Sequence, residues 1–244
     1  MPAAVRGPLR PGAAGREAVL VVARRELLPD GTWHGVRTAG LAEALRAIAG
    51  AGEFRPRADV EEDPSWQQII PHMVVRSDQG LLVMRRLTAS SEARLRHQYT
   101  LGVGGHINRQ DADGGGDPVV AGTVREWREE VVCAVPVPAT LVGLLKDDTA
   151  AVGRVHLGLV LLVEAGAAVV AVRERRKLEG EVLPPPAVRS RYLQLESWSQ
   201  LVHDALVAGE LEPPPRPAWR LTLPAVPDEP SAPVGPRTLG APST

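Results

Sequence analysis

The densest group of residues able to do chemistry lies at positions 125–130, where the sequence reads Arg-Glu-Trp-Arg-Glu-Glu. On a helix, positions i, i+3 and i+4 share one face, so Glu126, Glu129 and Glu130 crowd three carboxylates together. A divalent cation such as Mg²⁺ or Mn²⁺, which prefers oxygen ligands, would offset their repulsion. Arg125 can orient or neutralise one of them. Taken alone, the segment is better explained as a solvated charged face, and the metal site is the alternative that the surrounding signals favour.

Two further signals lie upstream of this segment. The run Gly102-Val103-Gly104-Gly105 allows backbone amides to approach an anion closely. Asp117 and Pro118 are a typical N-cap and first helical residue, which predicts a helix from there to about position 132. A glycine turn followed by an acidic helix is consistent with metal ions that bridge protein carboxylates and substrate phosphates and activate a water for attack on phosphorus. Residues 111–116 between them predict a flexible loop.

Apolar residues that alternate along the chain or recur at helical spacing predict the strands and helices that position these residues. Strands are expected at 18–23, 65–75, 81–86, 99–103, 141–145, 154–163 and 168–173. Helices are expected at 38–49 and 195–208, in addition to the acidic one. Pro71 falls inside a predicted strand and favours an edge or a bulge there. The order of elements predicts an α+β or layered α/β/α domain.

Composition narrows the class of protein. The chain has 244 residues, a net charge of -1 and a single cysteine, Cys133. The balanced charge argues against a protein that coats extended nucleic acid. One cysteine forms no internal disulfide and excludes a multi-cysteine metal site, which favours a reducing, cytoplasmic location. The most apolar stretch, 155–172, is interrupted by charge and predicts sheet core rather than a membrane span.

The motifs together resemble the signature of the Nudix hydrolases, G-x5-E-x7-R-E-U-x-E-E-x-G-U, where U is bulky and apolar. Positions 125–130 match its centre, with Trp127 as the bulky residue, while Val132 replaces the late glycine. Asp117 stands eight residues before Arg125, at the place of the first glutamate, so aligning Gly105 requires a six-residue insertion within 106–116. Likeness to a bacterial Nudix subgroup of predicted phosphoesterases extends over 61–158, through the segments 61–65, 68–71, 92–95, 104–108 and 155–158.

This resemblance implies an α+β fold, a Nudix-like α/β/α sandwich with a mixed sheet, at residues 63–211. Residues 16–62 would form an N-terminal extension packed on or beside the core, with a role that the sequence leaves open. Low-complexity composition predicts disorder at 1–15 and in the proline-rich segment 212–244.

The resemblance also implies roles for single residues. Glu129 and Glu130 would bind the metal, Glu126 would be a further ligand, and Arg125 would orient a carboxylate. A later glutamate would act as ligand or general base, with Glu179 preferred over Glu174 and Glu181. The residues expected to bind substrate are Gly104, Gly105, His106, Arg86 and Arg94. Asp117 has a sufficient role as helix cap.

Several of these residues keep a structural alternative. His106 could contact a phosphate or a metal-bound water, or it could cap the loop. For Arg85, Arg86 and Arg94, a surface salt bridge competes with phosphate binding. His156 lies in an apolar strand and is better explained as a hydrogen-bonded core histidine. Cys133 is expected to be a small core residue.

The expected function is a Mg²⁺-dependent hydrolase, with Mn²⁺ as an alternative ion, that cleaves a diphosphate linkage in a nucleoside diphosphate derivative or related metabolite. The alternative is a non-catalytic nucleotide-binding or regulatory module on the same fold. A prenyl diphosphate isomerase would need a paired cysteine and glutamate in the pocket, and Cys133 follows the helix instead. A small-molecule partner is expected, with no membrane, no extended nucleic acid and a homodimer left open.

Overall fold

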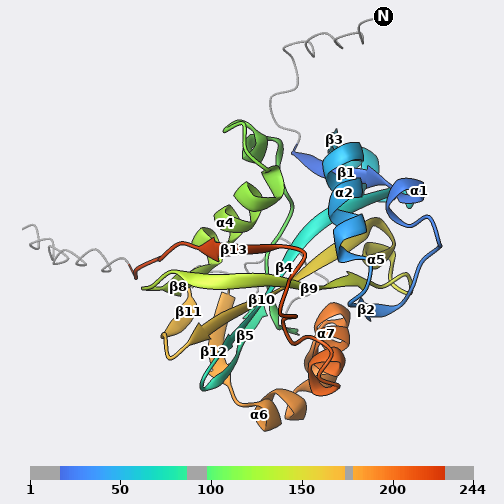
Figure 1. Cartoon of the computed structure of the whole chain (residues 1–244). Helices are drawn as coiled ribbons and strands as arrows, with labels where there is room; N and C mark the ends of the chain where they lie inside the picture. Colours follow the sequence, from blue (N-terminus) through green and yellow to red (C-terminus); the bar gives the residue numbers. More distant parts are fainter. Residues whose placement is uncertain (1–16, 87–97, 174–177, 229–244) are drawn as a thin grey trace, which may run out of the picture.

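A mixed β-sheet runs through the middle of the molecule in the computed structural model, which describes residues 17–86, 98–173 and 178–228 (Figure 1). Its central path is β12 (Leu178–Leu183), β5 (Gly80–Arg86), β4 (Trp66–Ser77), β10 (His156–Gly166), β9 (Val137–Lys146) and β13 (Arg220–Leu223). β4 and β10 run parallel, and the other neighbours on this path are antiparallel. The fold class predicted from the sequence is confirmed.

Helices cover both faces of this sheet. On one face α4 (Pro118–Glu130) and α2 (Leu41–Ala51) bury Trp127, Leu41 and Ile48 in the larger core cluster. On the other face α6 (Pro185–Ser190) and α7 (Ser197–Val207) pack through Val188 and Val202. β10 is buried almost throughout, as expected for a strand covered on both sides.

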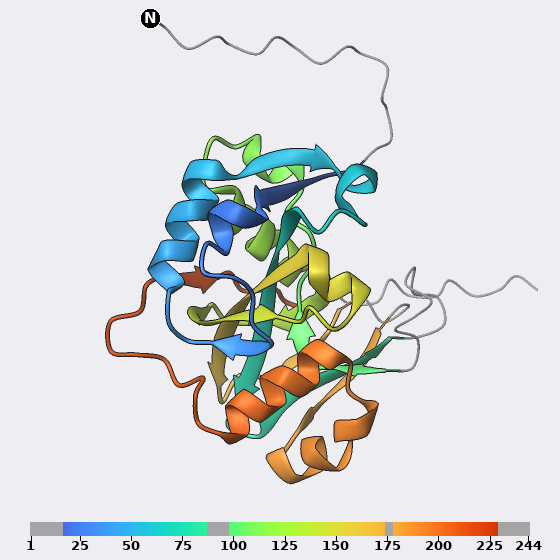
Figure 2. The same ribbon diagram turned by 90° about the vertical axis from the view of Figure 1, so that its right-hand side faces the viewer.

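The N-terminal residues extend the same sheet. β1 (Ala18–Ala23) pairs with the first residues of β4 and with β3 (Glu53–Pro56), and β2 (Gly35–Arg37) pairs with β9. Two short helices, α1 (Arg24–Leu27) and α3 (Arg57–Val60), complete this region. In Figure 2, β1 and β3 lie near the top of the molecule, close to the start of β4. The segment 18–60 is thus continuous with the core in its hydrogen bonding.

Several element ends differ from the sequence expectation. α4 ends at Glu130, because the β-branched Val131 and Val132 begin β8 (Val131–Cys133), which pairs with β11 (Val170–Val172) in a separate two-stranded sheet. Residues 151–155 form a short helix, α5 (Ala151–Val155), where the start of a strand was predicted. A 3₁₀ turn at Tyr192–Gln194 precedes α7.

Pro71 lies in the central strand β4 rather than at an edge of the sheet. Among the described strands, β1 pairs with β4 up to Gln68 and β7 (Gly102–Val103) pairs from Met73 onward. Between those residues this side of β4 carries no strand partner in the described part of the chain, so the missing amide of Pro71 costs no ladder hydrogen bond.

The prediction that residues 212–244 are disordered is wrong for the part that the structure describes. Residues 220–223 form β13, which pairs with β9 from Arg220–Thr140 to Leu223–Val137. The indole Nε1 of Trp127 donates to the carbonyl oxygen of Pro224 at 2.9 Å. Long-range pairing and burial of Leu223 overcome the proline-rich composition here. Within the described residues, no helix is long and apolar enough to cross a membrane.

Candidate active site

The acidic helix α4 is fixed at both ends. Asp117 caps it by accepting a 2.8 Å hydrogen bond from the amide of Val119, and Pro118 occupies its first turn, as predicted. Trp127 is fully buried and anchors the opposite end. The adjacent Glu126 is carried inward by the same packing and is only 8% exposed, whereas Glu129 lies on the exposed side.

Arg125 organises the polar groups around this helix. Its guanidinium makes a paired interaction with Asp111, from Nε to Oδ1 at 2.9 Å and from Nη2 to Oδ2 at 3.0 Å. Nη1 donates to Glu126 Oε1 at 2.6 Å and lies 3.5 Å from Glu129 Oε2. The hydrogen bonds that Arg125 donates to Asp111 raise the pKa of Arg125 above its ordinary value. Arg125 thus orients and partly neutralises two carboxylates, as expected.

The carboxylate of Glu126 lies directly against Gly105. A Cβ atom at position 105 would approach Glu126 Oε1 to 2.8 Å, so only glycine leaves room for this arrangement. Burial raises the pKa of Glu126 despite the opposing effect of Arg125. The same carboxylate is therefore held in a confined, largely desolvated place beside the guanidinium of Arg125.

Asp111 was missed by the sequence analysis, which assigned residues 111–116 to a flexible loop. It is 9% exposed, belongs to a 3₁₀ turn at Arg109–Ala112 and accepts a 2.7 Å hydrogen bond from the amide of Asn108. The sequence did contain a signal for Asp111. It follows Gly105 by six positions, which is the spacing of the glycine and the first glutamate in the signature, G-x5-E. If Asp111 takes the place of the first glutamate, as its ion pair with Arg125 suggests, the six extra residues follow Asp111.

The three helix glutamates do not form a ready-made metal cluster. Within the described residues, no group of three His, Cys, Asp or Glu side chains is arranged to hold a metal ion. Arg125 fills the space between Glu126 and Glu129, while the backbone carbonyl of Glu130 ends the helix by accepting from the amide of Arg173 at 2.8 Å. Two carboxylates nevertheless suit Mg²⁺, which commonly binds one or two protein carboxylates together with water and substrate phosphates.

The glycine turn runs along the unpaired side of β4. After β6 (Tyr99–Thr100) and β7, Gly104 adopts a φ of +149°, and a Cβ there would lie 1.9 Å from the carbonyl oxygen of Pro71. The chain then passes to Ile107, whose carbonyl accepts from the amide of Leu20 at 2.8 Å. This close approach explains Gly104, whereas the contact with the Glu126 carboxylate explains Gly105. Their binding of a substrate anion stays a prediction.

His106 and His156 contact one another across this turn. Their Nε2 atoms are 3.3 Å apart, and His156 Nδ1 lies 2.7 Å from the carbonyl oxygen of Val152. His156 is 6% exposed and hydrogen-bonded, as predicted for a core histidine. Burial, and then the charge of Arg57, lower the pKa of His106 to about 3. The carbonyl of His106 accepts from Arg125 at 2.7 Å, so the turn links the histidine pair to α4.

The structure does not bring Glu179 to the helix carboxylates. It lies on strand β12 rather than in a loop, and Arg85 binds it with Nε 2.5 Å from Oε1. Gly180 faces Val172 of β11, so the neighbouring residues of the strand point to the opposite face, where Glu181 pairs with Arg191 at 3.0 Å. The register of β12 on β5, which no local pattern encodes, decides this direction.

Three other residues that the sequence analysis proposed for the site are not tested by the structure. Glu174 and Arg94 lie outside the described residues, and so does the side chain of Arg86, the last residue of β5. Cys133 is buried on β8, which agrees with a small core residue.

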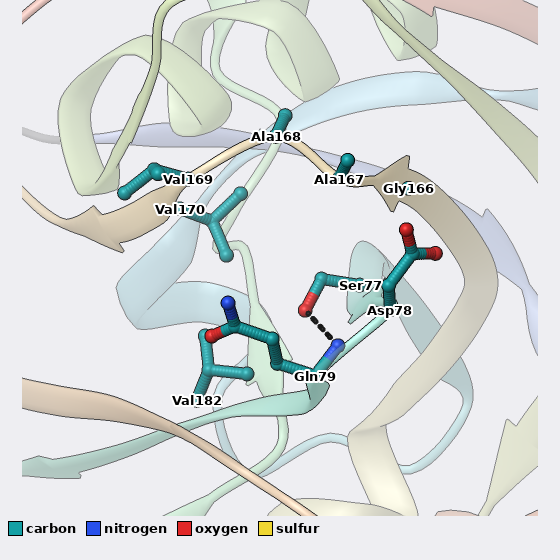
Figure 3. A pocket seen from close by; sticks show the side chains of 9 residues that line it. All are labelled: Ser77, Asp78, Gln79, Gly166, Ala167, Ala168, Val169, Val170 and Val182. Atoms are coloured by element: carbon teal, nitrogen blue, oxygen red, sulfur yellow. Dashed lines mark hydrogen bonds between the residues drawn. The ribbon is translucent and has the colours of Figure 1, made fainter.

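A hollow of about 240 Å³ lies at the other end of the sheet (Figure 3). It is bordered by Ser77, Asp78 and Gln79 of the β4–β5 turn and by residues 166–170 and Val182. Ser77 and Gly166 end β4 and β10, whereas Gln68 and His156 lie at the starts of these strands. The hollow therefore has no part in the carboxylate site.

Comparisons with known proteins agree with this geometry. No family model matches the sequence. The chain is 32% identical to protein YmaB of Bacillus subtilis (strain 168) over 201 residues, which cover 78% of this chain and 97% of YmaB. A crystal structure, that of Tm1382, described as a provisionally assigned Nudix hydrolase, superposes with a TM-score of 0.68 at 26% identity, over 79% of this chain and 99% of that one.

A Nudix hydrolase from Nitrosomonas europaea has a TM-score of 0.42 at 17% identity, over 60% of this chain and 93% of that one. The likeness to Tm1382 extends over about four fifths of this chain and nearly all of that one. The chain belongs to the Nudix superfamily.

Proposed function

We propose that this protein is a divalent-metal-dependent hydrolase that cleaves the diphosphate linkage of a nucleoside diphosphate derivative or a related phosphorylated metabolite. The arrangement of Glu126 carries the proposal. A buried carboxylate is packed against a glycine and shares one guanidinium nitrogen with the exposed Glu129. Burying this carboxylate costs folding free energy, and a role in ligand binding explains why that cost is tolerated.

Glu126 and Glu129 would hold the metal through their oxygen atoms, with Glu130 as a further candidate at the helix end. A bound Mg²⁺ would offset the charge of the diphosphate and lower the pKa of a coordinated water. Arg125 keeps Glu126 oriented and ties it to Asp111 and to the carbonyl of His106. In the reaction, an oxygen of water bonds to phosphorus, the P–O–P bridge breaks, and a helix carboxylate accepts the proton of the water.

The experiment is a hydrolysis assay of the full chain. Nucleoside diphosphate sugars, dinucleoside polyphosphates and nucleoside triphosphates are each incubated with Mg²⁺, with Mn²⁺ and with EDTA, and released phosphate or nucleoside monophosphate is measured. Glu126→Gln and Glu129→Gln are assayed beside Glu43→Gln, a matched control because Glu43 is exposed on α2 and pairs only with Arg46 in the described contacts. We expect metal-dependent turnover in the wild type and the control, and a loss of at least a hundredfold in the two site variants.

Two results would contradict the proposal. Equal activity in Glu129→Gln and wild type would remove α4 from the chemistry. Absence of turnover, together with a higher melting temperature in the presence of nucleotides, would instead favour the nucleotide-binding module.

A further inference from the structure

A fully buried lysine, Lys146, lies at the end of strand β9. Its Nζ donates to the carbonyl oxygen of Gly153 at 2.5 Å and to that of His156 at 3.1 Å. It also forms an ion pair with Asp148, in which Nζ lies 2.7 Å from Oδ1. Burying a lysine is costly even when its charge is paired, and the metal-assisted step described above makes no use of this side chain. Its place in the fold therefore needs another explanation.

The surroundings of Lys146 resemble those of a bound cation. Burial lowers the pKa of Lys146, and the hydrogen bond and charge of Asp148 oppose this effect. Asp148 is itself anchored by an ion pair with Arg24. Although burial alone would raise it, contacts with Arg24 and Lys146 hold the pKa of Asp148 below its ordinary value. Two carbonyl oxygens and an ionised carboxylate can only accept hydrogen bonds, so the ammonium lies among oxygen acceptors.

The carbonyl oxygens around Lys146 belong to the short helix α5 and to its exit into β10. The last carbonyls of a helix have no partner within the helix. Here those of residues 152–154 accept from side chains, in turn from His156 Nδ1 at 2.7 Å, from Lys146 Nζ and from Gln67 Nε2 at 2.9 Å. A carbonyl oxygen only accepts, so His156 Nδ1 carries a hydrogen in either charge state of the ring. The hold of Lys146 on the backbone thereby fixes the acceptor that orients the imidazole.

The ring of His156 extends this support to the glycine turn. Its Nε2 lies 3.3 Å from Nε2 of His106. Gly105, the residue before His106, is packed against the carboxylate of Glu126. An unbroken series of contacts therefore joins the buried ammonium of Lys146 to the carboxylate that carries the proposed function.

We propose that Lys146 is a positioning residue of the active site. Its ammonium takes the place of a bound monovalent cation and holds the backbone of α5, so that His156 supports His106 and the glycine turn beside Glu126. The inference rests on the proposed function, because the group finally positioned is the carboxylate assigned to the metal. Lys146 itself contacts neither metal nor substrate. An ion pair that only stabilised the fold would leave the imidazole of His156 and the turnover of the folded enzyme unchanged.

An NMR experiment on the full chain tests the positioning without any turnover. With ¹⁵N-labelled histidine, the wild type should show a hydrogen-bonded Nδ1–H of His156. Lys146→Met removes the charge but keeps an unbranched side chain. We expect the Nδ1–H of His156 to shift in this variant and to exchange with water at least about tenfold faster. Val188→Ala is the matched control, because it removes buried apolar atoms on α6, which packs on β5, and should leave the His156 resonance in place.

A kinetic experiment tests the link to the reaction. Lys146→Ala removes Cγ, Cδ, Cε and Nζ, which together match the heavy atoms of n-propylammonium. At a temperature where both variants are folded, we expect kcat/KM about tenfold below wild type for Lys146→Ala and within about twofold for Val188→Ala. Added n-propylammonium should bring Lys146→Ala to within about threefold of wild type. Tetramethylammonium at the same ionic strength, which donates no hydrogen bond, should not.

Where Lys146→Ala does not fold, the same two ions are added during refolding. Recovery of the folded chain with n-propylammonium alone would support the cation site, and no recovery with either ion would overturn it. The inference is also overturned by an unchanged His156 resonance in Lys146→Met, by an equal change in Val188→Ala, or by wild-type kcat/KM in Lys146→Ala. If the wild type hydrolyses no compound, the proposed function fails, and the NMR comparison still decides whether Lys146 positions His156.

Discussion

Gly105 and Glu126 are in direct contact, and a single added carbon at position 105 would lie within 2.9 Å of both carboxylate oxygens. The backbone at Gly105 needs no left-handed conformation, so the constraint comes from the carboxylate alone. We expect Gly105→Ala to displace Glu126 and lower kcat/KM about a hundredfold, with a small change in melting temperature. Gly114→Ala is the control, since a Cβ there meets no atom within 4 Å. Full activity of Gly105→Ala would show that the position of Glu126 is unimportant.

Gly104 should behave in the opposite way. Its φ is +149°, and an added Cβ would lie 1.9 Å from the backbone oxygen of Pro71, which shifts less easily than the end of a flexible side chain. Gly104→Ala should therefore lower the free energy of unfolding by about 2 kcal/mol or more, measured by urea denaturation. Stability equal to that of Gly105→Ala would contradict this distinction between the two glycines.

Arg125 joins three parts of the site through Asp111, Glu126 and the carbonyl of His106. Lysine keeps the charge but cannot make the paired contact with Asp111. We expect Arg125→Lys to cost about 2 kcal/mol of unfolding free energy and to reduce activity, whereas Arg128→Lys, at an exposed position of the same helix, should change neither. Calorimetry and the hydrolysis assay check both, and equal stability of the two variants would mean that the network contributes little.

His72 makes stability depend on pH. Burial lowers its pKa from 6.5 to about 4, and its Nε2 has no partner among the described residues. Between pH 6.5 and 4 the unfolded chain therefore takes up a proton that the folded chain does not, so stability falls as pH falls. Going from pH 7 to pH 5, this group should cost about 2 kcal/mol. In urea denaturation, His72→Leu should lose less stability than wild type by that amount, and parallel pH profiles would refute the assignment.

Removal of strand β13 by truncation is expected to lower the melting temperature. Ending the chain before Trp219 removes the pairing with β9 and the Pro224 acceptor of Trp127, and we expect a clearly lower melting temperature. Ending it after Asp228 keeps every described element and is the control. Equal melting temperatures for the two truncated chains would mean that the pairing of β13 adds nothing to the fold.

The sequence by itself determined the features that depend on neighbouring residues. The N-cap Asp117, the helix with its glutamates on one face, strand β1 and the core histidine His156 all follow from short-range patterns, because capping and hydrophobic periodicity act within a few residues. The family resemblance rested on the same short segments.

Only the tertiary structure decided the contacts between distant segments. Asp111 meets Arg125 across 14 positions, His106 meets His156 across 50, and Trp127 meets Pro224 across 97. The face taken by Glu179 depends on the register of β12 against β5, and β13 forms only because β9 offers it a free edge. Strand pairing and burial of remote residues leave no local signal in the sequence, and here they determine which polar groups share the site.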